Sequence, residues 1–96
     1  MRSIIQETKE CFITHDTQNL HYHHIFGGTG NRRLSDQYGL TVWLRADWHN
    51  MANYGVHFNR ELDLKLKRLA QTKWEERFGS REEFRKIFGK SWLDME

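Results

Sequence analysis

The spacing of hydrophobic and polar positions changes along this chain, and each change predicts a different element. Residues 20–26 alternate with a period of two, which predicts a β-strand. Residues 41–44, Thr-Val-Trp-Leu, are the β-branched and aromatic residues typical of a second strand. Glycines at 27, 28 and 30 end the first strand and permit unusual backbone angles. The two strands are therefore expected to form a β-hairpin.

Two shorter segments flank these strands. The apolar triplet 11–13, Cys-Phe-Ile, predicts a short strand or knuckle, and residues 15–19 have turn-forming side chains. Between the strands, Ser35 is expected to cap one helical turn that runs through Tyr38 and closes at Gly39.

The pattern becomes helical after Arg45. Asp47 is a plausible N-cap, and the four-residue step from His49 to Asn53 would place both side chains on one face of a short helix that ends at Gly55. This helix is expected to pack against the hairpin.

Two further helices are expected near the C-terminus. Asn59 can cap a long amphipathic helix that stops at Gly79. Ser80 and Glu83 match the capping-box pattern and open a second helix before Gly89. The inward positions are expected to be Leu62, Leu66, Leu69, Ala70, Trp74 and Phe78 in the first helix and Phe84, Ile87 and Phe88 in the second, with Ser91, Trp92 and Leu93 packed back on the pair.

This order of elements predicts the α+β class. One domain spans residues 1–96, with a hairpin-plus-helix core at about 11–58 and a cover of two C-terminal helices at about 59–93. The chain is short enough that a metal ion or a partner would add useful stability.

The composition indicates the cellular compartment of the protein more clearly than its function. The 15 basic and 13 acidic residues give a formal charge of +2, too mild to indicate nucleic-acid binding by itself. A single cysteine excludes an internal disulfide and fits a reducing compartment. No apolar run approaches the length of a membrane helix. A soluble, cytoplasmic protein is expected, without membrane association.

The most informative chemistry lies in the histidines. His15 and His21 are read as ordinary surface or core groups, whereas His23 and His24 are adjacent at a strand end and precede glycines. Imidazole titrates near neutral pH, so it can accept a proton from water or bind a metal ion. Strict alternation sends neighbouring side chains to opposite faces, so both can serve one site only if the strand twists or ends there.

These residues resemble the HNH group of the ββα-metal (His-Me finger) endonucleases, especially small phage-encoded members, over residues 11 to 93. The resemblance rests on six short segments. They are His23-His24-Ile25-Phe26-Gly27-Gly28, Trp43-Leu44 with His49-Asn50, Gly55-Val56-His57, the helix Leu62-Asp63-Leu64-Lys65-Leu66-Lys67, and the terminal Ile87-Phe88-Gly89-Lys90.

The resemblance implies a one-metal hydrolytic site. His24 would be the catalytic base that activates water, and His23 and His49 would hold one divalent ion, Mg²⁺ or Mn²⁺. The other implied positions are a further metal ligand at Asn53 and supporting residues at Asn50 and His57.

The chain also departs from the family pattern. Similar phage proteins carry two Cys-x-x-Cys pairs that bind zinc, and the matching positions here are Cys11, Thr14, Arg45 and Trp48. With three of four ligands missing, a structural zinc is not expected. The middle asparagine of the HNH name is also absent around Gly39 and Leu40.

Three functions follow. The first is a metal-dependent endonuclease that cleaves DNA in preference to RNA, with Arg32 and Arg33 holding the phosphate backbone. The second is a catalytically degenerate phage protein that binds and inhibits a host defence protein such as a CRISPR effector, as an anti-CRISPR does. A zinc-free DNA-binding module without catalysis is the third.

Overall fold

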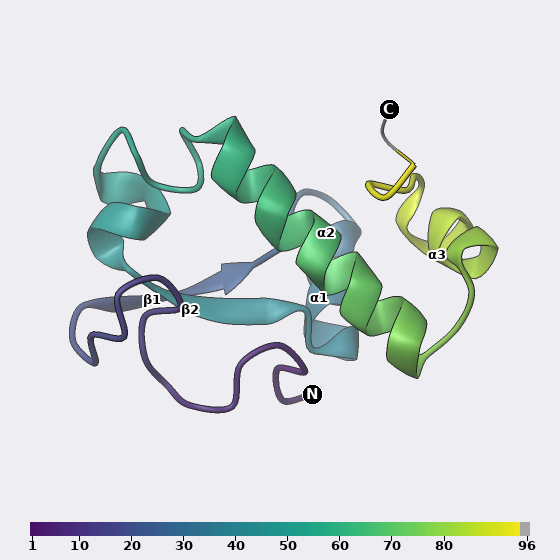
Figure 1. Ribbon diagram of the computed structural model, residues 1–96, viewed down its shortest axis with the longest axis horizontal. Coiled ribbons are helices and arrows are strands. Elements are labelled where there is room, and N and C mark those ends of the chain that lie inside the picture. Colours follow the sequence, from purple (N-terminus) through teal and green to yellow (C-terminus); the bar gives the residue numbers. More distant parts are fainter. Residues whose placement is uncertain (95–96) are drawn as a thin grey trace.

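A computed structural model describes residues 1–94 and has the expected α+β architecture (Figure 1). Strands β1 (Leu20–His24) and β2 (Thr41–Arg45) pair antiparallel, with Leu20 opposite Arg45 and His24 opposite Thr41. The elements that follow are η1 (Asp47–Met51), α2 (Arg60–Arg77) and α3 (Arg81–Phe88), and α1 (Asn31–Tyr38) is inserted between the strands.

The two-stranded sheet lies between two layers. Helix α2 crosses one side of it and the N-terminal segment runs along the other, while α3 packs beyond the end of α2 (Figure 1). One cluster of buried apolar side chains is drawn from β2, from α2 and α3, and from the segments just after β1, before β2 and before α2: Ile25, Phe26, Leu40, Val42, Leu44, Val56, Leu66, Ala70, Trp74, Phe84 and Phe88. Among residues 1–94, no helix combines the length and apolar character needed to cross a membrane.

The prediction that Ser35 caps a single helical turn is wrong. Helix α1 begins four residues earlier, and Ser35 is fully buried inside it. Its hydroxyl accepts a hydrogen bond from the Phe26 N–H at 3.0 Å and donates one to the Phe26 carbonyl at 2.8 Å, so it secures the backbone just after β1. Gly39 does close the helix, at φ 70°, and a Cβ there would lie 2.2 Å from the Arg2 carbonyl oxygen.

The helix after β2 also differs from the prediction. It is a single wide turn of π-helix that ends at Met51, because Ala52 is already extended at φ −145°. Asp47 is its first residue rather than its cap, and the carboxylate accepts hydrogen bonds from the Arg45 side chain. Gly55 lies beyond the helix and packs so closely that a Cβ would be 2.8 Å from the His49 carbonyl oxygen. The chain thus folds back on η1.

The two C-terminal helices follow the sequence pattern closely. The Asn59 side chain accepts a hydrogen bond from the Leu62 N–H, and Ser80 with Glu83 forms the full capping box. Phe78 and Ile87 are exceptions, because they are 38% and 39% exposed rather than inward-facing. The segment after α3 packs back as expected, with the Trp92 N–H donating to the Gln71 side-chain oxygen at 2.7 Å.

The segment before β1 contains no strand; the triplet 11–13 lies at the start of a turn. Its backbone is tied to the sheet by the Phe12 N–H, which donates to the Trp43 carbonyl at 2.8 Å. At the end of the hairpin, Arg45 forms ion pairs with both Asp16 and Asp47. These pairs join the segment before β1 to the start of η1.

Candidate metal centre

Three histidines from different elements converge beside the sheet. His23 lies on β1, His49 on η1 and His57 in the loop that leads to α2, and one ring nitrogen from each falls within 4.8 Å of the others. The His49 and His57 Nε2 atoms are 3.0 Å apart. His23 Nε2 is buried and has no hydrogen-bond partner among residues 1–94. Since a buried polar atom without a partner is costly, this nitrogen is well placed to bind a ligand.

A fourth histidine orients this group. His21 Nδ1 lies 2.9 Å from His49 Nδ1, which leaves the opposite nitrogen of His49 directed at His57. Histidines that bind metal ions usually have their second ring nitrogen held by such a hydrogen bond, which fixes the ring orientation and the tautomer. The fold-back at Gly55 supports the third member, because the His57 N–H donates to the His49 carbonyl at 3.1 Å.

Burial keeps the central rings neutral. The pKa of His23 is lowered to about 3, mainly by burial and then by its neighbours His49 and His57. Burial, together with His57 and His21, lowers the pKa of His49 to about 4. A neutral imidazole has a lone pair for a metal ion, so both rings are in the ligand form at neutral pH.

His24 lies next to this group at the last position of β1. Its side chain is largely buried, and its Nε2 is 2.8 Å from Asp36 Oδ1 on α1. An ionised carboxylate can only accept, so Nε2 carries the proton and Nδ1 carries the lone pair in the neutral ring. The ring edge also contacts Tyr22, with centroids 5.2 Å apart.

The three-histidine group and His24 meet at an open cleft of about 540 Å³. His23, His24 and His57 all line this cleft. The adjacent strand positions of His23 and His24 share one cleft because β1 ends there. Arg32 lines the adjoining hollow with these histidines, whereas Arg33 does not. Both arginines are exposed in the first turn of α1, not in a loop as expected.

The two predicted asparagines are not part of this cluster. Asn53 lies beyond the end of η1 and is exposed, so the expected shared face with His49 does not exist. Asn50 is also exposed, and among the described residues that line the two histidine hollows neither asparagine occurs. His57, expected as a supporting residue, instead lies in the ligand group.

Two residues of the site were not predicted from the sequence. His21 was read as an ordinary group, although its two-residue spacing from His23 places both on one face of the strand. Asp36 gave no signal, because its approach to His24 depends on where α1 begins and how it packs on the hairpin.

The donor set decides which ions fit. Three imidazoles without a carboxylate suit transition metals such as Zn²⁺, Co²⁺ and Ni²⁺ better than Mg²⁺, which prefers oxygen ligands. The partnerless His23 nitrogen and the His21 contact to His49 both fit such a metal centre.

Comparisons with known proteins do not identify a family: no protein-family model matches the chain, and no curated protein or solved structure is significantly similar to it.

Proposed function

We propose that this protein is a metal-dependent endonuclease of the HNH type that hydrolyses phosphodiester bonds in nucleic acid. The observation that carries the proposal is that His23 and His57 of the three-histidine group line one cleft together with His24, which is paired with Asp36. Phosphodiester hydrolysis needs both a water-activating base and a positive charge at the phosphate.

His24 is the base in this proposal. With Nε2 donating to Asp36, Nδ1 is the atom that takes the proton from water. Asp36 holds the ring in this tautomer and stabilises the positive charge that forms on it. The proton therefore passes from water to His24 Nδ1, and Asp36 keeps the proton already on Nε2 in place.

His23, His49 and His57 hold the metal ion. A bound divalent ion supplies Lewis-acid stabilisation of the phosphate and of the leaving oxygen. Mn²⁺ and softer transition ions are favoured over Mg²⁺ by the imidazole ligands. Arg32 lines the hollow beside these rings and contributes a phosphate contact, while Arg33 has a lesser, peripheral role.

The direct test is cleavage of labelled DNA and RNA, single- and double-stranded, with Mg²⁺, Mn²⁺, Co²⁺, Ni²⁺ or Zn²⁺. Wild type is expected to cleave with at least one transition ion, DNA in preference to RNA. His24→Ala should lose cleavage and keep its affinity for nucleic acid, because the base acts on water rather than on binding. Gln37→Ala, at an exposed position of α1, is the matched control.

Absence of cleavage by wild type with every ion would overturn the enzymatic proposal. A catalytically degenerate phage protein that binds a host defence protein, such as a CRISPR effector, would then be the better reading, to be tested by affinity capture of purified effectors. Under either reading we place the protein in the cytoplasm of a bacterial host.

A further inference from the structure

One large apolar side chain that lines the histidine cleft is mostly exposed to solvent. Phe58 is 65% exposed, and it lines the same cleft as His24 and His57. Isolated exposed apolar residues are common on protein surfaces, so exposure alone carries little meaning. Its position in the histidine cleft separates it from the other exposed apolar residues, apart from Tyr22, which is 40% exposed and lines the adjoining hollow.

Backbone hydrogen bonds hold the segment that carries Phe58 in place. The Phe58 N–H donates to the Gly55 carbonyl at 2.9 Å, and the preceding Val56 is buried and donates from its N–H to the Trp48 carbonyl. Asn59, the next residue, caps α2. Phe58 is therefore presented from a loop that is fixed on both sides, which lowers the entropy cost of binding a ligand there.

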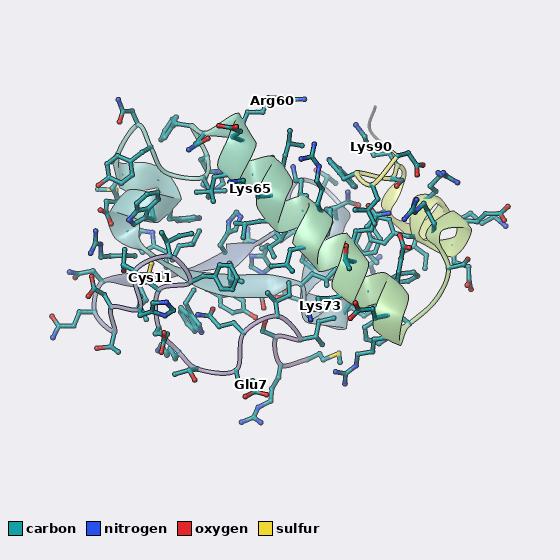
Figure 2. The ribbon with its side chains drawn as sticks, in the orientation of Figure 1. Glu7, Cys11, Arg60, Lys65, Lys73 and Lys90 are labelled. Carbon is teal, nitrogen blue, oxygen red and sulfur yellow. The ribbon has the colours of Figure 1, made fainter. Side chains whose placement is uncertain are left out.

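Two basic side chains and the acidic Asp63 line the same cleft as the exposed ring. Arg60 lines the cleft two residues on, and Figure 2 shows it at the start of α2, extending from the surface. Lys67 lines the cleft as well, although it is paired with Asp63. An aromatic face among cations is the surface that single-stranded nucleic acids use, with bases stacked on rings and phosphates near basic groups.

We propose that Phe58 stacks on an unpaired base next to the scissile phosphate, so that the substrate is single-stranded or locally unpaired nucleic acid. The location of that phosphate rests on the proposed nuclease function. In a duplex the bases already stack on each other and cannot cover the ring. Stacking tolerates every base, so little sequence preference is expected.

The test measures binding without catalysis. Fluorescence anisotropy in EDTA would compare a 12-nucleotide oligothymidine, its RNA counterpart and a DNA duplex. Phe58→Ala should weaken single-strand binding about 5- to 100-fold, the range given by loss of one stacked base. Phe58→Trp should bind as tightly as wild type or more tightly, and duplex binding should change little. The DNA and RNA arms decide which sugar the cleft prefers.

Met51→Ala is the matched control, because Met51 is 71% exposed and lies outside the histidine cleft. An oligonucleotide with abasic sites should bind wild type as weakly as the normal strand binds Phe58→Ala. The inference is overturned if Phe58→Ala binds single strands like wild type, or if it weakens duplex binding equally. Cleavage by wild type with unaltered binding by Phe58→Ala would leave the nuclease proposal intact. If binding depends on Phe58 but wild type cleaves no substrate, the nuclease proposal is rejected and the stacking of a base on Phe58 is retained.

Discussion

His23 is a buried residue that lowers the stability of the fold while leaving one nitrogen available to a metal ion. It is 5% exposed, and its Nε2 has no partner among residues 1–94. A buried polar group in that condition costs about 1 to 3 kcal/mol. Such a cost is expected where a ligand would supply the missing interaction.

The first prediction concerns the pH dependence of stability. Burial lowers the pKa of His23 to about 3 from its ordinary 6.5. Between these values the unfolded chain binds a proton that the folded protein does not, so the free energy of unfolding falls as the pH drops. The loss is expected to reach a few kcal/mol, since a tenfold change in proton affinity is worth about 1.4 kcal/mol. Urea titrations in EDTA from pH 7.5 to 4 would measure it.

His23→Leu is the informative variant for this measurement. It should be more stable than wild type in EDTA and show a flatter dependence on pH, because the buried titrating group is gone. Gln37→Leu, at an exposed site, should follow wild type within about 0.5 kcal/mol. An unchanged slope in His23→Leu would mean that another group titrates.

The second prediction assigns Asp36 as the positioning residue for His24. Asp36→Asn keeps the shape of the side chain but removes the charge that stabilises the protonated ring. We expect kcat to fall about 10- to 100-fold, which is no more than the roughly 10²- to 10⁴-fold that general-base catalysis supplies, with little change in KM. Steady-state cleavage kinetics would measure both constants. A rise in KM with constant kcat would instead make Asp36 a substrate-binding group.

At the scale of elements, the helices with strong local signals were predictable and the site was predictable only in part. The caps at Asn59 and Ser80 depend on side chains within three residues of the helix start, so the sequence contains the full signal. Ser35 and Asp47 are also residue types that commonly cap helices, yet each side chain bonds to a residue outside its own helix. Ser35 bonds to Phe26, and Asp47 bonds to Arg45. At both positions a tertiary contact overrides the local preference of the residue for a helix cap.

The end of η1 explains the remaining errors at the site. A regular α-helix would continue far enough to put Asn53 on the face of His49, but a π turn followed by extended Ala52 stops it. The fold-back that replaces it brings His57 to His49 instead. Nothing in the spacing of the histidines along the chain encodes this contact, because it requires the close backbone approach at Gly55.

The third prediction tests the buried face of α2. Leu66 and Trp74 are buried against the sheet and α3, so replacing either with Ala should cost about 2 to 5 kcal/mol. Lys65 is exposed and should tolerate Ala within about 0.5 kcal/mol in denaturant titrations. Lys67, expected from the sequence to be equally tolerant, is mostly buried and paired with Asp63, so it is no neutral control. Equal losses at Lys65 and Leu66 would contradict this assignment of faces.

The whole molecule combines one apolar core cluster with a separate group of histidines that could hold a metal ion. The core cluster draws on the sheet and on α2 and α3, and Arg45 ties the end of the hairpin to its neighbouring segments through Asp16 and Asp47. Metal binding is therefore expected to add stability to a chain that already folds, in contrast to small domains that unfold when their zinc is removed.

The fourth prediction follows from this separation. The protein should stay folded in EDTA, as judged by circular dichroism, and its thermal midpoint should rise when Zn²⁺ or Ni²⁺ is added. A ligand at 100 times its dissociation constant stabilises the folded state by about 2.7 kcal/mol. Mg²⁺ should produce a much smaller rise, because the three ligands are imidazoles. His49→Gln should abolish the rise and remain folded, whereas unfolding of wild type in EDTA would show that the metal holds the fold together.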